Sequence, residues 1–302
     1  MIIVISGPTA SGKTDLSVKL AGIIGAEIIN CDSRQIYKFM DIGTAKPGID
    51  HFSSVKHHLF DVIYPDEYFN AVMYMEMARE VAGRLDREKK DIILTGGSGF
   101  YIQAFLHGLS HLPEIEDRTK ALVADRLAAT HTRELYDEMQ AIDPLYAESI
   151  DLNDRYRIRR FYEMFYTVKC PVTDYFKNNP PRPVDIPYIY FYLERERGFL
   201  YASIDRRVDE MMEKGLKTEV DVLLERGYHK SLPSMNTIGY AEIIRMLEGG
   251  YSYDDTVGLI KQNTRNFAKR QIIWFRKIKE KISICDINGI KYYLKEFNGV
   301  KI

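Results

Sequence analysis

The sequence feature that most limits how this chain can fold is a glycine-rich motif near its start, which fits the pattern G-x-x-x-x-G-K-[ST] at every position. The motif lies between an apolar run, Met1–Ser6, and a helical pattern, Gly12–Ile24. In this setting the glycines permit a tight turn, and backbone N–H groups at the helix N-terminus point toward a phosphate. We therefore predict a loop that binds a diphosphate or triphosphate, formed by Gly7, Pro8, Thr9, Ala10, Ser11, Gly12, Lys13 and Thr14.

Strand and helix patterns alternate through the first hundred residues, which is typical of a parallel sheet covered by helices. Further strands are predicted at Ala26–Cys31 and Asp91–Leu94, and a later one at Tyr188–Leu193. A helix is predicted at Asn70–Arg87, with an apolar face formed by Met73, Met77, Val81 and Leu85. Short polar segments follow the strand ends, where open α/β sheets place their ligands.

The middle of the chain has no strand pattern. From Asp117 to Lys177 apolar residues recur at helical spacing, and a proline-rich segment, 178–183, closes this block. We therefore predict an α/β fold, a P-loop NTPase-like doubly wound parallel sheet formed by residues 1–116 and 184–302, with a helical insertion domain at 117–183. Helices are predicted in the last part at Phe199–Arg226, Ile238–Leu247 and Tyr253–Lys281.

The composition excludes several classes of protein. With 302 residues, 45% of them hydrophobic and 28% charged, the chain can bury a sizeable core. Its three cysteines are scattered, so neither a disulfide framework nor a cysteine zinc cluster is predicted. No apolar run approaches the roughly 18 residues of a membrane span, and no signal-peptide pattern is present. We expect a soluble, cytoplasmic protein.

The formal net charge of −1 conceals a local asymmetry. Residues 153–182 hold seven Lys or Arg against three Asp or Glu, and residues 261–282 hold eight against one. Basic segments attract an RNA backbone, and interleaved aromatic rings offer stacking faces. The alternatives are a solvated charged face and, for Phe161, Phe165 and Trp274, packing in a core. Two basic segments in different domains favour a clamp around an RNA stem-loop.

A carboxylate, Asp32, follows the second predicted strand, at the edge of the sheet where the phosphate loop is expected. It could be a helix N-cap, a general base or a carboxylate that organises Mg²⁺. The third strand ends in Thr95 rather than in the acidic residue usual in nucleotide hydrolases, so the bound phosphate could belong to a leaving group instead of ATP. For the adjacent His57 and His58 we favour a structural role over metal binding.

A series of short motifs follows the phosphate loop in a characteristic order. They are DSRQIY, DIGTAKP, HH and GGSGFY, then YRIRR followed by a glutamate, TIGY and KRQIIWFR. Each motif alone occurs in other P-loop proteins, but the ordered set spans about residues 2–276. This set resembles the tRNA dimethylallyltransferase family, the isopentenyl transferases of the bacterial type.

The resemblance implies transfer of a dimethylallyl group from dimethylallyl diphosphate to N6 of the adenosine immediately 3′ of the tRNA anticodon, assisted by Mg²⁺. It implies that Asp32 is the general base that an exocyclic amine needs, and that Arg207 and the phosphate loop hold the diphosphate. Ser98, which stands where the family usually has threonine, would complete the catalytic set, and the Thr14 hydroxyl would hold the metal.

The implied partners are a tRNA anticodon stem-loop and dimethylallyl diphosphate, with no membrane, and we expect a monomer. Tyr156 stands where the family usually has glutamine. The tRNA-binding residues implied by the resemblance are Asp32, Ser33, Arg34, Gln35, Arg118, Tyr156, Arg157, Arg160, Thr237, Ile238, Gly239, Tyr240, Lys269, Arg270, Gln271, Trp274 and Arg276.

Two other classes of function share the phosphate loop. A P-loop small-molecule or nucleoside kinase would need a cluster of lid arginines and an acceptor beside the ATP γ-phosphate, and it leaves the basic segment 261–282 without a role. A non-catalytic RNA-binding module switched by a nucleotide would make Asp32 and Arg207 dispensable.

Overall fold

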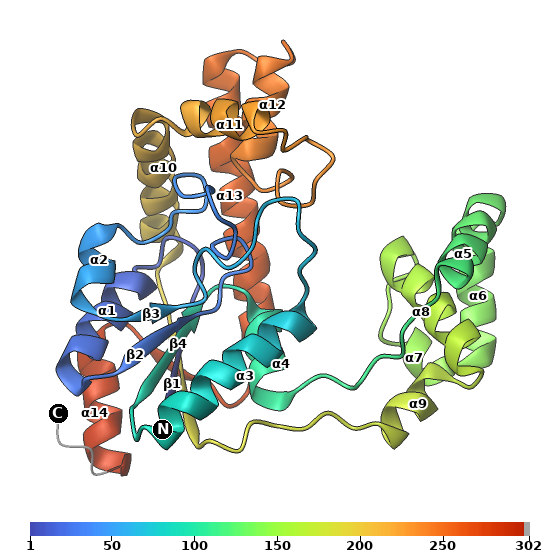
Figure 1. Cartoon of the computed structure of the whole chain (residues 1–302), viewed down its shortest axis with the longest axis horizontal. Helices are drawn as coiled ribbons and strands as arrows, with labels where there is room; N and C mark the ends of the chain where they lie inside the picture. The colour runs from blue at the N-terminus through green and yellow to red at the C-terminus, as the bar shows by residue number, and fades with distance from the viewer. Residues whose placement is uncertain (299–302) are drawn as a thin grey trace. The chain divides into compact units, whose positions relative to one another are not determined.

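The computed structural model describes residues 1–298; residues 299–302 of the predicted core lie outside this range. Its first compact unit contains a six-stranded parallel sheet with the strand order β3-β2-β4-β1-β5-β6, of which Figure 1 labels β1 to β4. The strands are β1 (Ile2–Ser6), β2 (Glu27–Asn30), β3 (His57–His58), β4 (Ile92–Gly96), β5 (Tyr188–Leu193) and β6 (Ile282–Ile284). The predicted doubly wound parallel sheet is confirmed.

Helices cover both faces of the sheet because its strands are apolar on both sides, as parallel strands usually are. On one face α1 and α14 pack against Ile3 and Ile5, and on the other α3 and α4 pack against Ile2 and Val4. The helices of this part are α1 (Lys13–Ile24), α2 (Ile49–Ser54), α3 (Ala71–Arg87), α4 (Gly99–His107), α10 (Arg197–Glu213), α11 (Leu216–Glu225), α12 (Tyr240–Leu247), α13 (Tyr253–Arg276) and α14 (Ile287–Asn298).

Several predicted elements differ from those observed. The buried residues of α3 are Ala71, Tyr74, Ala78, Ala82 and Leu85. Of the predicted apolar face only Leu85 is buried, whereas Met73, Met77 and Val81 lie beside the buried positions and are half-buried. The helix predicted at Phe199–Arg226 is divided into α10 and α11, because Gly215 takes the left-handed conformation with φ +92°. The last predicted helix ends at Arg276 rather than Lys281, and the chain then enters β6.

Residues 107–183 form a second compact unit with its own core. Its helices are α5 (Asp117–Ala129), α6 (Thr132–Ile142), α7 (Pro144–Ala147), α8 (Arg155–Val168) and α9 (Val172–Asn178). The buried Asp143 carboxylate accepts hydrogen bonds from the backbone N–H groups of Tyr146 and Thr173, and so links α7 to α9. The unit begins ten residues before the predicted boundary at Asp117, and its assignment to tRNA binding stays a prediction.

The first unit closes on itself where the chain leaves and re-enters it. The backbone N–H of Val184 donates a hydrogen bond to the Leu106 carbonyl at 2.8 Å.

The longest helix, α13, has 24 residues but carries charged side chains along much of its length. Within residues 1–298, no helix combines the length and apolarity needed to cross a membrane.

Candidate active site

The phosphate loop connects the buried end of β1 to the start of α1. Gly12 has φ +88° and Ala10 has φ +61°, so the loop turns sharply in conformations that glycine adopts most easily. A Cβ on Gly7 would lie 3.1 Å from the Leu193 carbonyl oxygen, so this position has little room for a side chain. The loop is therefore held tightly against the sheet, with the start of α1 directed at one cavity.

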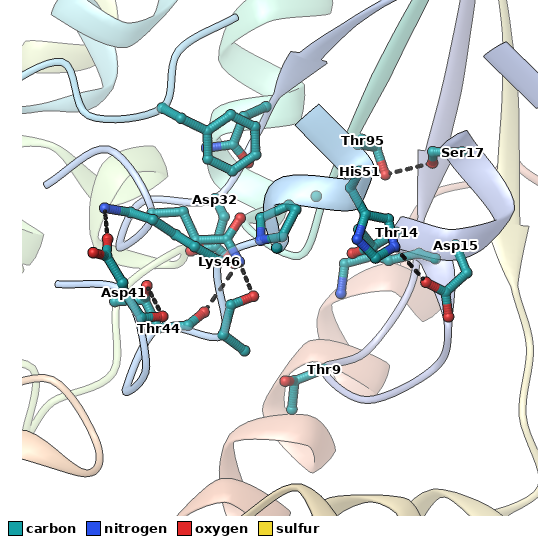
Figure 2. Close-up of a pocket in the computed structure, with 18 of the residues that line it drawn as sticks. Thr9, Thr14, Asp15, Ser17, Asp32, Asp41, Thr44, Lys46, His51 and Thr95 are labelled. Atoms are coloured by element: carbon teal, nitrogen blue, oxygen red, sulfur yellow. Dashed lines mark hydrogen bonds and ion pairs between the residues drawn. The ribbon is translucent and has the colours of Figure 1, made fainter. Parts of the chain in front are cut away.

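This cavity, of about 610 Å³, lies at the carboxyl edge of the sheet (Figure 2). Its wall combines residues from distant parts of the sequence, which is typical of α/β ligand sites. The predicted site residues that line it are Thr9, Ala10, Ser11, Gly12, Lys13, Thr14, Asp32, Gln35 and Arg207. Gly7, Pro8, Ser33, Arg34 and Ser98 lie in neighbouring segments but are not part of the lining.

Asp32 reaches the cavity from the loop that follows β2. One oxygen of its carboxylate accepts a hydrogen bond from the Arg34 backbone N–H at 2.9 Å, which fixes the turn. Asp32 still lines the cavity, so it can act both in the turn and on a bound ligand. The turn packs closely on β4, because a Cβ on Gly96 would lie 1.9 Å from the Cys31 carbonyl oxygen.

Lys13 and Arg207 supply positive charge to the cavity. Burial lowers the pKa of Lys13 to about 8, since a buried ammonium loses hydration; Asp32 partly opposes this shift and Arg207 adds to it. Burial also lowers the pKa of Arg207, opposed by Glu210 and by Asp15. Arg207 stays protonated at neutral pH, and one of its N–H groups donates to the Thr9 hydroxyl at 3.4 Å.

Ser98 belongs to the loop between β4 and α4, directly beside the Asp32 turn. Its hydroxyl accepts a hydrogen bond from the Ser33 backbone N–H at 2.9 Å and donates to the Ser33 hydroxyl at 3.2 Å. Ser98 therefore supports Ser33, the residue next to Asp32, and does not itself line the cavity.

The carboxyl end of β4 carries Thr95, as the sequence indicated. Its hydroxyl accepts a hydrogen bond from Ser17 at 2.9 Å and donates to the Ile5 carbonyl at 3.3 Å (Figure 2). A strand-end carboxylate of the kind that organises Mg²⁺ in P-loop hydrolases is thus replaced by a neutral hydroxyl with protein partners.

One wall of the cavity was not predicted. Lys46 donates hydrogen bonds to the Tyr37 carbonyl and to the carboxylates of Asp41 and Asp61, and so ties two loops together (Figure 2). The Gln35 amide donates to the Thr44 carbonyl at 3.0 Å in the same wall. The motif DIGTAKP marks this segment in the sequence, but its contacts depend on which loops the fold brings together.

A divalent cation would have few protein ligands here. Within residues 1–298, no group of three or more His, Cys, Asp or Glu side chains could hold a metal ion. His57 and His58 have structural partners instead: the Val55 carbonyl and the Glu27 carboxylate. The Thr14 hydroxyl beside a phosphate site does fit Mg²⁺, because Mg²⁺ commonly binds through substrate phosphates, waters and one or two protein oxygens.

The predicted RNA-binding residues of α13 fall on two faces. Lys269, Arg270 and Arg276 are exposed, and Trp274 is partly exposed with its ring 6.4 Å from that of Phe100. Gln271, by contrast, points into the protein with 6% of its surface exposed.

The motif TIGY is largely internal. The Tyr240 ring is fully buried, and its hydroxyl donates a hydrogen bond to Glu219, whose carboxylate also accepts from the backbone N–H of Gly43. Thr237 is buried, Ile238 is half-buried, and the Gly239 N–H donates to Glu242. Tyr240 thus supports the wall that contains Lys46, and the Thr237 hydroxyl donates to the Ser234 carbonyl, so direct RNA contact by either side chain would require a different conformation.

The predicted RNA-binding residues of the second unit lie on its surface. Tyr156 is 78% exposed on α8, and Arg118 is exposed on α5. Arg157 pairs with Asp154 and Arg160 pairs with the buried Glu163, so both arginines are held in place while their guanidinium groups remain partly accessible.

The fold and the site define a class of protein: a P-loop fold whose phosphate loop, carboxylate and arginine converge on one cavity. Comparison with known proteins identifies the family. The model of the IPP transferase family matches residues 35–278, and the chain belongs to this family.

Individual relatives agree with this result. A tRNA dimethylallyltransferase of Thermotoga maritima is 41% identical over 301 residues, which cover 98% of this chain and 97% of that protein. The crystal structure of tRNA delta(2)-isopentenylpyrophosphate transferase from Staphylococcus epidermidis is 31% identical, with a TM-score of 0.69 over 99% of this chain and 98% of that one. A eukaryotic dimethylallyltransferase acting on tRNA, 24% identical, shares the fold with a TM-score of 0.80 over 99% of this chain and 76% of that one.

Proposed function

We propose that this chain transfers the dimethylallyl group of dimethylallyl diphosphate to N6 of the adenosine immediately 3′ of the anticodon in tRNA. The observation that carries the proposal is the convergence of Asp32, Arg207 and the phosphate loop on one cavity, in a chain of the IPP transferase family. The full-length similarity to tRNA dimethylallyltransferases favours this reaction over a nucleoside kinase. That the protein is cytoplasmic and monomeric stays a prediction.

In this reaction a C–N bond forms between N6 of adenosine and C1 of the prenyl group, while the bond from C1 to the diphosphate oxygen breaks. The electron pair of the breaking bond leaves with the diphosphate, which Lys13, Arg207 and the loop N–H groups stabilise. The N6 proton passes to the Asp32 carboxylate. To reach the cavity, the adenine must leave its stack.

Mg²⁺ would be held by the Thr14 hydroxyl and diphosphate oxygens, and it supplies further charge neutralisation of the leaving group. The exposed cations Lys269, Arg270 and Arg276 on α13 would bind the RNA backbone, as would Arg157 of the second unit. Ser98 supports the Asp32 turn through Ser33.

The proposal is tested by offering the protein two donors side by side. With an unmodified anticodon stem-loop and Mg²⁺, we expect dimethylallyl diphosphate to give an RNA product heavier by one dimethylallyl group, as detected by mass spectrometry of the digested nucleosides. ATP with nucleoside acceptors should give no phosphorylated product. Turnover only with ATP and a small acceptor would overturn the proposal.

A further inference from the structure

Gln271 connects two loops at the carboxyl edge of the sheet. Its side-chain oxygen accepts a hydrogen bond from the Thr9 backbone N–H at 2.8 Å, and its side-chain nitrogen donates to the Gly97 carbonyl at 2.9 Å. Thr9 belongs to the phosphate loop and Gly97 to the loop after β4. Gln271 has only 6% of its surface exposed, so its bond to Gly97 is shielded from water, and its bond to Thr9 lies partly buried beside the cavity.

The space around this side chain is closely matched to it. A Cβ added to Gly97 would lie 2.4 Å from the Gln271 side-chain nitrogen, a distance that real Cβ atoms do not adopt. A side chain at position 97 would therefore displace the Gln271 amide from its present position. Removal of the amide would leave the buried Gly97 carbonyl without this partner and would free the Thr9 N–H at the wall of the cavity.

Each end of Gln271 continues toward a different reacting group. On one side, the Thr9 hydroxyl accepts a hydrogen bond from Arg207, which faces the leaving group. On the other side, Gly97 precedes Ser98, whose hydroxyl holds Ser33 beside Asp32. Gln271 thus lies between the part of the site that binds the diphosphate and the part that holds the base.

We propose that Gln271 is a positioning residue that fixes the separation of these two parts of the site, so that the prenyl donor and the acceptor amine meet in reacting geometry. This inference rests on the proposed function, and it assigns Gln271 an internal role in place of the RNA contact predicted from the sequence. A displacement of about 1 Å between reacting groups can lower a rate by about 100-fold.

The first test replaces Gln271 by leucine, which keeps most of the volume and removes both hydrogen bonds. We expect kcat to fall at least about tenfold while KM for tRNA changes by less than about threefold. The Kd of inorganic pyrophosphate should rise about three- to tenfold, because the Thr9 N–H loses its acceptor. The matched control is Gln262→Leu, the same substitution at an exposed position of α13, which should leave kcat and the Kd of inorganic pyrophosphate unchanged.

The second test is a double-mutant cycle. In the wild-type background Gly97→Ala should lower kcat about as much as Gln271→Leu does, since the new methyl group displaces the Gln271 amide. In a Gln271→Ala background the methyl group meets empty space, so the same Gly97→Ala change should cost less than about threefold. If Gln271 merely stabilised the fold, its replacement would alter the melting temperature, but the effect of Gly97→Ala on kcat would not depend on the residue at position 271.

Three outcomes would overturn the inference. A large rise in KM for tRNA with kcat and pyrophosphate affinity unchanged would make Gln271 an RNA contact. A lower melting temperature with unchanged kinetic constants would make it a packing residue only. Additive effects of the two substitutions on kcat would also contradict it. If the wild-type protein transfers no dimethylallyl group, the proposed function fails, whereas the pyrophosphate measurement still tests the contact between Gln271 and the phosphate loop.

Discussion

Two groups of ionisable side chains lie at the two ends of β2, and they differ in how their charges are balanced. At the start of the strand, the buried Glu27 carboxylate is hydrogen-bonded to His58 at 2.6 Å and to Lys90 at 2.5 Å. Beyond the end of the strand, Asp32 and Lys13 face the same cavity and act on each other through space.

The pKa is lowered in both groups, but the cause differs. Burial alone would raise the pKa of Glu27, but hydrogen bonds from Lys90 and His58 outweigh burial and hold the pKa at about 2. At Lys13 burial dominates and lowers the pKa to about 8. Two direct cationic partners thus favour the charged form of Glu27, whereas within residues 1–298 Lys13 has only a hydrogen bond to the Pro8 carbonyl and the more distant charge of Asp32 to oppose burial. The first group is therefore internally compensated, and the second leaves positive charge facing the cavity.

The largest effect is expected from Asp32→Asn. Asparagine can still accept the hydrogen bond from the Arg34 N–H, so the turn should survive, but it cannot take a proton. Transfer should fall about 10²- to 10⁴-fold, with RNA binding retained in a gel-shift assay. Near-normal activity would mean that Asp32 only stabilises its turn through the hydrogen bond to Arg34. Asp32 would then have a structural role, as Glu27 has.

A smaller loss is expected from Arg207→Gln, which removes a half-buried positive charge from the wall of the cavity. The rate of transfer should fall about 100-fold, since stabilising groups for a developing anion typically contribute this much. Single-turnover kinetics at saturating donor measure it. An equal loss in the affinity for tRNA alone would instead place Arg207 in the RNA interface.

The pH dependence of donor binding should follow Lys13. Because its pKa in the empty site is about 8, the ammonium is charged below this pH and loses its proton above it. The ratio of the Kd of inorganic pyrophosphate for the wild type to that for Lys13→Arg should be nearly constant below pH 8 and rise above it, up to about tenfold per pH unit. Lys13→Arg is the reference because arginine keeps its charge, while the ionisation of pyrophosphate itself affects both proteins equally. A ratio that stays constant to pH 9.5 would contradict the lowered pKa.

Glu27→Gln should affect stability and leave transfer unchanged. The pKa of Glu27 in the folded protein lies below the ordinary value of 4.5. The ionised carboxylate therefore contributes about 1–3 kcal/mol to the free energy of unfolding above pH 4.5, and this contribution is lost as the pH falls toward 2. At neutral pH the variant should melt about 5 °C lower, and its acid-unfolding curve should flatten between pH 4.5 and 2. Calorimetry over this range measures both; a loss of kcat at unchanged stability would assign Glu27 to the active site.

Much of the fold could be predicted because its signals are local. The apolar runs at Ile2–Ser6 and Tyr188–Leu193 are buried strands in the structure, and the phosphate loop lies between a strand and a helix as the motif requires. The strands β3 and β6 were missed because they have two and three residues, too few to show a pattern. In α3 the buried positions include small alanines, which let the helix approach the sheet but carry little hydrophobic signal.

The candidate site was predictable in its residue types and less so in its contacts. The phosphate loop and Asp32 follow from motif and position, and Arg207 came only with the family resemblance. The sequence could not show that Gln271 turns inward while Arg270 turns outward, since adjacent residues on a helix face different sides and only the packing decides which is buried.

The hydrogen bond between Val184 and Leu106 bears on how this architecture could have arisen. Leu106 and Val184, the residues that flank the inserted unit, are joined by this hydrogen bond, so the sheet-containing unit is continuous in space although it is discontinuous in sequence. A short turn joining these two residues would restore an uninterrupted α/β chain. Insertion, removal or exchange of the helical unit at these two junctions would therefore leave the sheet and its cavity intact.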